Sequence, residues 1–220
     1  MTRRTTHTRK SGTAPPGRVR IVAGKWRGRF LPVADLPDLR PTSERIRETL
    51  FNWLAPRIEG SHCLDLFAGT GVLGLEALSR GAAEVVLVER SNDAIEALHK
   101  SVAVLDAEGA IVHAGDALAY LRRREPVPMD IVFLDPPFAH ESLTEVCTLL
   151  DERSWLAPGA SVYLERDARR IGPELPHGWT VRREKKAGNV RYSLLDVHRS
   201  TAGRERETGS ATAGTIGEPD

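Results

Sequence analysis

Short apolar runs alternate with segments of helical periodicity between residues 62 and 134, and this alternation restricts the fold more than any other feature of the sequence. The apolar runs are nearly continuous, which is typical of strands buried on both faces of a parallel sheet. Helices then connect neighbouring strands as right-handed crossovers. The pattern predicts strands at 62–67, 84–89, 110–113 and 130–134, and helices at 71–80, 92–104 and 116–124.

Three further apolar runs extend the predicted sheet to seven strands. A helix at 143–150 precedes a strand at 160–165, and two late runs follow at 179–184 and 190–197. The late runs can pair as an antiparallel hairpin, because Gly188 and Asn189 between them supply a turn. The sequence therefore predicts an α/β fold with a mostly parallel seven-stranded sheet that is closed by an antiparallel hairpin.

A small extension of short strands and one helix precedes the sheet. Residues 19–23 form a predicted short strand, followed by a basic turn at 24–29 and a second extended piece. The helix begins after Pro41, where Thr42 or Ser43 can cap it. Its apolar positions follow the helical period and are Ile46, Leu50, Trp53 and Leu54.

Length and composition limit the organisation of the chain. With 220 residues and 40% hydrophobic content, the chain can build one substantial core. We expect a disordered basic tail at 1–17, an N-terminal extension at 18–60, one main domain at 61–199 and a second disordered tail at 200–220. Cys63 and Cys147 are the only cysteines, which favours buried reduced thiols over a disulfide or metal site. No apolar stretch reaches the length of a membrane span, which predicts a cytoplasmic protein that binds no membrane.

Charge is distributed unevenly, although the formal net charge is only +1. Residues 1–34 contain nine Lys or Arg and no acid, whereas the remainder has 22 basic and 30 acidic residues. This distribution suggests a polyanionic partner, but a merely solvated terminus explains it equally well. Arg45 and Arg47 lie off the apolar stripe of their helix, so we expect both to face solvent or substrate.

A glycine-rich loop joins the first strand and the first helix of the predicted sheet. Residues 69–74 match the pattern G-x-G-x-x-G, and Glu89 ends the next strand. Glycines allow a tight turn close to a ligand, and a carboxylate at the end of the next strand can accept hydrogen bonds from both ribose hydroxyls. The loop predicts a nucleoside site but does not identify the nucleoside, because dinucleotide enzymes have the same geometry.

Two acidic residues favour S-adenosylmethionine as the nucleoside. Asp65 precedes the loop, where a carboxylate can bind an ammonium group but would repel a pyrophosphate. Asp116 can accept a hydrogen bond from the adenine amino group, with Ala117 beside it. A helix N-cap is an equally good explanation of Asp116.

The tetrad Asp135-Pro136-Pro137-Phe138 follows the strand at 130–134, at the edge where open α/β sheets bind ligands. Asp135 and the carbonyl of Pro136 can each accept one N–H of an amine on an aromatic ring, while the prolines fix the backbone. Phe138 offers a flat face for a base. With a methyl donor alongside, the tetrad predicts methyl transfer to an exocyclic base nitrogen, driven by positioning. An ordinary Pro-Pro turn with a capping Asp is the alternative.

Beyond these motifs, three stretches are similar to the RsmD family, bacterial enzymes that methylate the N2 amine of a guanine in 16S ribosomal RNA. The stretches are Arg20-Ile21-Val22-Ala23-Gly24 with the basic turn, Arg40-Pro41-Thr42 with Arg45 to Asn52, and Lys186-Ala187-Gly188. The resemblance covers about residues 18–199 and implies a Rossmann-like class I S-adenosylmethionine-dependent methyltransferase.

The resemblance also implies the residues and partners of the site. The cofactor-binding residues are Asp65, Phe67, Ala68, Gly69, Thr70, Gly71, Glu89, Asp116 and Ala117, and the catalytic residues are Asp135, Pro136, Pro137 and Phe138. The RNA-binding residues are Arg20, Lys25, Arg27, Arg29, Arg40, Thr42 and Arg45. The implied substrate is 16S ribosomal RNA in a small-subunit assembly particle. We expect a monomer with no metal ion and no obligate protein partner.

Three other functions stay open at this point. An adenine-N6 DNA methyltransferase could use the same tetrad, although no segment is left over for a DNA-recognition region. A nicotinamide-dependent oxidoreductase could use the glycine-rich loop, although no catalytic Tyr-Lys or His constellation accompanies it. A non-catalytic RNA-binding assembly factor would need only the basic N-terminal part.

Overall fold

The computed structural model describes residues 17–33, 42–137 and 143–198. The two predicted tails lie outside these ranges, apart from Gly17, whose carbonyl accepts a hydrogen bond from Val33. Arg40 and Phe138, two of the predicted site residues, lie outside the described ranges as well. Every helix in the described part is too short or too polar to span a lipid bilayer.

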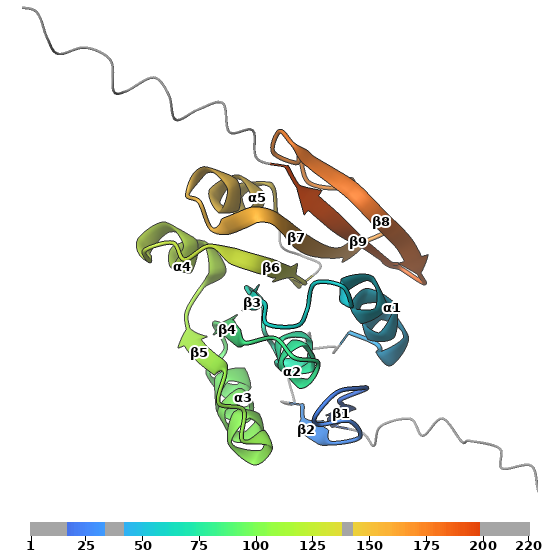
Figure 1. The fold of residues 1–220 in the computed structure, drawn as a ribbon, viewed down its shortest axis with the longest axis vertical. Coiled ribbons are helices and arrows are strands. Elements are labelled where there is room, and N and C mark those ends of the chain that lie inside the picture. The colour runs from blue at the N-terminus through green and yellow to red at the C-terminus, as the bar shows by residue number, and fades with distance from the viewer. Residues whose placement is uncertain (1–16, 34–41, 138–142, 199–220) are drawn as a thin grey trace, which may run out of the picture.

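Seven strands form one sheet in the order β5-β4-β3-β6-β7-β9-β8. Their bounds are β3 His62–Asp65, β4 Glu84–Glu89, β5 Ala110–Ala114, β6 Met129–Leu134, β7 Leu156–Asp167, β8 Trp179–Ala187 and β9 Val190–Val197. In sheet order, β5 to β7 run parallel, and β9 is antiparallel to both of its neighbours. The predicted mostly parallel sheet with a closing hairpin is confirmed (Figure 1).

Helices cover both faces of this sheet (Figure 1). One face carries α1 Glu44–Leu54, α2 Val72–Ser79 and α3 Asn92–Leu105, and the other carries α4 Ala117–Arg123 and α5 Leu143–Glu152. Successive residues of a strand belong to different faces, as Cys63 and Leu64 of β3 do, and each face has its own cluster of buried apolar side chains. The nearly continuous apolar runs in the sequence follow from this burial on both faces.

The ends of several elements are set by side chains that were visible in the sequence. Ser43, rather than Thr42, caps α1, because its hydroxyl accepts the N–H of Ile46 at 3.4 Å. β7 is longer than the predicted strand at 160–165. Pairing with β6 begins at Leu156, and pairing with β9 continues to Asp167.

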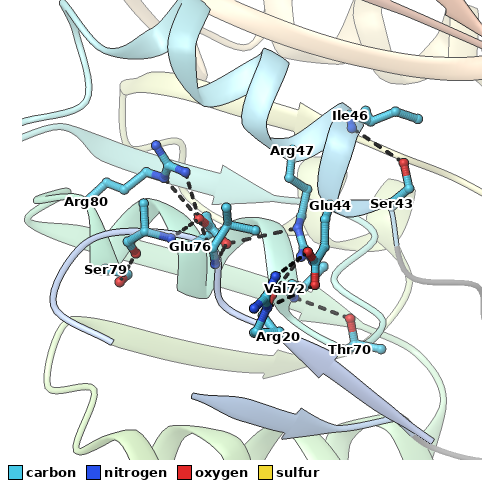
Figure 2. Close-up of polar contacts among 12 residues, drawn as sticks. Arg20, Ser43, Glu44, Ile46, Arg47, Thr70, Val72, Glu76, Ser79 and Arg80 are labelled. Carbon is cyan, nitrogen blue, oxygen red and sulfur yellow. Dashed lines mark hydrogen bonds and ion pairs between the residues drawn. The ribbon is translucent and has the colours of Figure 1, made fainter. Parts of the chain in front are cut away.

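The N-terminal extension is bound to α2 by a buried carboxylate. β1 (Arg18–Arg20) and β2 (Phe30–Pro32) form a separate two-stranded antiparallel sheet. The chain after β1 is held by Glu76 of α2, whose oxygens accept the N–H groups of Val22 and Ala23 at 2.9 and 3.0 Å. Arg80, which directly follows α2, donates to the same fully buried carboxylate (Figure 2).

Arg47 of α1 is fully buried, so the expectation that it faces solvent or substrate is wrong. Its Nε lies 4.0 Å from the Glu76 carboxylate, and its guanidinium donates to the carbonyl of Arg20 at 2.7 Å (Figure 2). Burial lowers the pKa of Arg47, and the charge of Glu76 opposes this shift. The arginine is tolerated inside the protein because an opposite charge accompanies it. Arg45, on the other side of the helix, is exposed as expected.

The basic turn at 24–29 packs against the carboxyl ends of two helices. The N–H of Lys25 donates to the Ser79 carbonyl at 2.6 Å, and Arg29 donates to the carbonyl of Val104 at 3.0 Å. Gly24 has a φ of +82°, and a Cβ there would lie 1.7 Å from the Ser79 carbonyl oxygen. Only glycine fits this contact. The turn therefore lies about 12 Å, the length of α2, from the start of that helix.

Candidate active site

Four carboxylates lie at the ends of neighbouring strands along one edge of the sheet. Glu89 ends β4, Asp65 ends β3, Asp135 follows β6, and Glu165 lies near the end of β7. Because these parallel strands are neighbours, their carboxyl ends share the edge where open α/β sheets bind ligands. The structure thus brings together three residues that the sequence predicts and adds Glu165, which sequence analysis missed.

Glu89 fixes the glycine-rich loop. Its Oε2 accepts the N–H of Gly69 at 2.7 Å, and its Oε1 accepts the N–H groups of Arg90 and Ser91 at 2.9 and 2.8 Å. Gly69 and Gly71 have φ values of +52° and +73°, which favour glycine. The other predicted residues of this segment, between Asp65 and α2, are Phe67, Ala68 and Thr70. The hydrogen bond from Gly69 to Glu89 therefore fixes the loop beside the carboxyl ends of β3 and β4.

Asp65 is a buried carboxylate with an unused oxygen. It is 1% exposed, and no donor among the described residues contacts its Oδ1. Burial, followed by the charge of Asp135, raises the pKa of Asp65 to about 7, against hydrogen bonds from the N–H groups of Phe67 and Gly74. A buried oxygen without a donor fits the ammonium group of S-adenosylmethionine, which would supply a hydrogen bond and a compensating charge.

Asp116 combines a capping role with a position beside the glycine-rich loop. Its Oδ1 accepts the N–H of Ala119 at 3.0 Å, so it caps α4. The preceding residue, Gly115, donates its N–H to the carbonyl of Glu89 at 2.8 Å, which places Asp116 and Ala117 next to the end of β4. The cap accounts for one of the two carboxylate oxygens, and Oδ2 can still accept a hydrogen bond.

Asp135 is held by a residue from the N-terminal extension. Thr42, itself buried, donates its hydroxyl to Asp135 Oδ2 at 2.7 Å. Burial raises the pKa of Asp135, and the Thr42 hydrogen bond works against that shift. Pro136 is buried and Pro137 is exposed. Thr42, predicted as an RNA-binding residue, thus contacts the carboxylate of the Asp135-Pro136-Pro137-Phe138 tetrad, which we call the amine motif.

Glu165 and Tyr163 form a second buried acid site one strand further along the edge. The Tyr163 hydroxyl donates to Glu165 Oε2 at 2.6 Å, and Glu165 is 5% exposed. Burial, followed by the charge of Asp135, raises the pKa of Glu165. The sequence does contain a signal for Glu165. It is an acidic residue at the end of an apolar run, in the strand predicted next after the Asp-Pro-Pro motif.

A pocket of about 230 Å³ opens beside the amine motif. Its lining includes Pro136, Pro137 and Glu165. The pocket lies between the prolines after β6 and the end of β7. In the described ranges, no group of three or more metal-binding side chains converges.

The predicted RNA-binding residues fall into two groups. Thr42, Arg20 and Arg45 lie at the start of α1, where Arg20 forms an ion pair of 2.7 Å with Glu44. Lys25, Arg27 and Arg29 lie in the basic turn, at the opposite end of α2 from the glycine-rich loop. Arg20 of β1 connects the two groups, because it pairs with Phe30 of β2, directly after Arg29. The next residue, Ile21, donates its N–H to the Arg29 carbonyl at 2.9 Å.

A family model described as conserved hypothetical protein 95 matches residues 19–196. Several curated relatives carry the name ribosomal RNA small subunit methyltransferase D. The relative from Escherichia coli K12 is 47% identical over 186 residues, which cover 84% of this chain and 93% of the relative. The relative from Haemophilus influenzae is 45% identical over 183 residues, which cover 81% of this chain and 93% of the relative.

Solved structures share the fold. The candidate methyltransferase yhhF of Escherichia coli has a TM-score of 0.77 at 45% identity, covering 83% of this chain and 99% of that protein. An RNA methyltransferase from Salinibacter ruber, solved with S-adenosyl-L-homocysteine, has a TM-score of 0.57 at 16% identity, covering 73% and 95%. The second similarity concerns the fold alone, and it confirms the predicted Rossmann-like methyltransferase architecture. The chain therefore belongs to the RsmD family, that of the ribosomal RNA small subunit methyltransferases D.

Proposed function

We propose that this protein transfers a methyl group from S-adenosylmethionine to the N2 amine of a guanine in 16S ribosomal RNA. The observation that carries the proposal is the adjacency of Asp65 and Asp135. In the parallel pair of β3 and β6, Asp65 lies opposite Phe133, two residues before Asp135. Asp135 therefore lies on the neighbouring strand and two residues, ~6.6 Å, further along it. A donor bound through Asp65 and an amine bound through Asp135 would thus occupy neighbouring positions at the same edge of the sheet.

Residues at the ends of β3 and β4 would hold the donor. Asp65 would accept a hydrogen bond from its ammonium group, and Glu89 would accept hydrogen bonds from the ribose hydroxyls. Asp116 would accept the adenine amino group through Oδ2, beside Ala117. The glycine-rich loop at 67–71 would bring its backbone close to the ligand. The donor supplies an electrophilic methyl carbon.

Asp135 and Pro136 would hold the acceptor amine. Thr42 engages Oδ2 of Asp135, so Oδ1 is left to accept one N–H, and the Pro136 carbonyl can accept the other. Holding both N–H groups aims the nitrogen lone pair, and such alignment can lower the barrier by roughly 7 to 11 kcal/mol. The methylated nitrogen must lose a proton, which the Asp135 carboxylate is placed to accept, since burial raises its pKa. We propose Phe138 as the face on which the base stacks.

The names of the curated relatives support 16S ribosomal RNA as the substrate. The residues proposed to contact its phosphates are Arg20, Lys25, Arg27, Arg29, Arg40 and Arg45. We further propose that the substrate is a small-subunit assembly particle and that the protein acts on it as a monomer, without an obligate protein partner. Ribosome assembly in bacteria takes place in the cytoplasm, which is therefore the proposed location.

The test uses the purified full chain, isotopically labelled S-adenosylmethionine and small-subunit particles from bacteria that lack the homologous enzyme. Mass spectrometry of the digested RNA should detect labelled N2-methylguanosine at a single position. Asp135→Ala should lower kcat/KM by about 100-fold or more, because the amine loses its alignment. Asp130→Ala, an exposed position at the other end of β6, is the matched control and should keep full activity.

Two outcomes would contradict the proposal. Labelled N6-methyladenosine, in RNA or in DNA, would identify an adenine enzyme that uses the same tetrad. No incorporation into naked 16S RNA or into particles, with the protein folded and binding the donor, would exclude the proposed substrate.

A further inference from the structure

We propose that Glu165 determines which base is methylated, by accepting the N1–H of a guanine whose N2 amine is held at Asp135. This inference rests on the proposed function and concerns the part of the site that faces the ring of the base. The residues proposed to hold the donor and the amine do not distinguish guanine from other bases with an exocyclic amine.

The position of Glu165 follows from the register of two strands. In the parallel pair of β6 and β7, Leu134 lies opposite Leu164, and Asp135 and Glu165 each follow directly. The two carboxyl groups are therefore neighbours on adjacent strands, about one strand spacing apart. In guanine, the N2 amine and the N1–H lie side by side on one edge of the ring. A guanine with its amine at the end of β6 can thus present N1–H toward the end of β7.

The surroundings of Glu165 suit a recognition group rather than a surface acid. The carboxyl is 5% exposed, and the Tyr163 hydroxyl fixes it through Oε2 at 2.6 Å. Among the described residues, no hydrogen bond is formed by Oε1. The same glutamate lines the pocket of about 230 Å³ beside Pro136 and Pro137. A fixed, largely dry acceptor therefore borders the space next to the amine motif.

The chemistry of N1 explains why such an acceptor selects guanine. Guanine carries a hydrogen on N1, whereas adenine and 2,6-diaminopurine carry a bare lone pair there. A carboxylate facing a bare nitrogen leaves two acceptors opposed, and a site built for a hydrogen bond discriminates strongly against ligands that lack the donor. Burial and the charge of Asp135 raise the pKa of Glu165. The assays are therefore run at alkaline pH, where this carboxyl is ionised and can accept the N1–H.

The test compares two bases that both carry an N2 amine. Small-subunit particles are assembled from 16S RNA with either guanosine or 2,6-diaminopurine riboside ligated into the modified position. The wild-type protein should prefer guanosine by about 100-fold or more in kcat/KM. Glu165→Gln should reduce this preference at least tenfold, because its amide N–H can donate to the bare N1 of 2,6-diaminopurine. Because glutamine has nearly the same shape as glutamate, this substitution should change the hydrogen bonding at the site without disturbing its packing.

Controls separate recognition from folding and from the proposed function. Glu174→Gln, an exposed residue in the segment after β7, should leave the preference unchanged. The melting temperature and the affinity for S-adenosylmethionine should match the wild type in both variants. If Glu165→Gln does not fold, Tyr163→Phe, which retains the carboxyl but removes its hydrogen bond, should lower the preference by a smaller factor.

Three results would overturn the inference. A wild-type protein that methylates both bases equally well shows that N1 is not recognised, while the proposed function stands. A Glu165→Gln variant that slows both bases equally, with the preference intact, makes Glu165 a structural or proton-accepting group. A wild-type protein that leaves guanosine unmodified contradicts the proposed function, and the inference with it.

Discussion

Asp65, at the end of β3, is only 1% exposed, and its burial should couple binding of the methyl donor to the release of a proton. Its pKa is raised to about 7, so the group is mainly protonated in the free protein in mildly acidic solution. A bound ammonium group favours the ionised form. We expect donor binding to release close to one proton at about pH 6, and less as the pH approaches 8. Titration calorimetry in buffers of different ionisation enthalpy measures this release.

The variant Asp65→Asn has no proton to release, so its binding should be weaker and independent of the buffer. Asp93→Asn changes an exposed aspartate in the first turn of α3 and should behave as the wild type does. Release that persists in Asp65→Asn would assign the proton to another group and argue against Asp65 as the ammonium site.

The same residue connects stability to pH in the donor-free protein. Because the folded-state pKa of Asp65 is raised to about 7, the protonated acid stabilises the folded state. That contribution is complete below the unfolded pKa, about 3.9, and is lost as the pH rises through the folded pKa. We expect Asp65→Asn to exceed the wild type in free energy of unfolding by ~4 kcal/mol at alkaline pH, and by little at about pH 4. Urea denaturation across this range measures the difference, and parallel profiles would contradict it.

At the scale of elements, Glu76 connects α2 to α1 and to the chain after β1. Glu76→Ala leaves two backbone N–H groups without their acceptor and the buried Arg47 guanidinium without its opposite charge. Breaking a buried ion pair in this way costs ~3 to 5 kcal/mol. We expect a loss of that size in the free energy of unfolding, measured by urea denaturation. Glu96→Ala, which removes an exposed ion pair with Lys100 on α3, should change it very little, and equal losses would argue against the role of Glu76.

The sequence predicts well those elements whose evidence is local. The runs at 84–89 and 190–197 match β4 and β9 in both bounds, because polar residues flank each apolar run. β7 extends beyond the run at 160–165 at both ends. Pairing with β6 adds Leu156, separated from the run by Pro158 and Gly159, and pairing with β9 adds the polar residues Arg166 and Asp167. Strand ends at a shared sheet edge follow from topology, which is why Asp65, Glu89 and Asp135 could be grouped in advance.

Contacts between separate elements could not be predicted in the same way. The burial of Arg47 depends on a carboxylate from another helix, and nothing in the pattern of its own helix indicates that partner. The role proposed for Glu165 depends on its register with β6, which fixes its distance from Asp135 only once the strands are paired. The Thr42 hydrogen bond to Asp135 likewise joins the N-terminal extension to the main sheet.

At the scale of the whole molecule, the proposed RNA contacts spread along the face that carries α1, α2 and α3. Arg45 lies near the amine motif, whereas exposed Arg27 lies at the far end of α2, about 12 Å from the glycine-rich loop. An RNA that places its target base at Asp135 and also reaches the basic turn must cross this face. Each phosphate contact then adds to the salt dependence of binding, because neutralised phosphates release counterions.

We therefore expect Arg27→Ala to weaken binding to small-subunit particles and to reduce the slope of log K against log salt concentration by about 0.7 to 0.9. The methylated position should not change, because the residues proposed to select the base, Asp135 and Glu165, lie at the ends of β6 and β7. Arg123→Ala, on α4 at the opposite face of the sheet, is the matched control and should preserve the slope. Filter binding across a series of salt concentrations measures both. An unchanged slope for Arg27→Ala would remove the basic turn from the RNA interface, and a reduced slope for Arg123→Ala alone would move that interface to the α4 face.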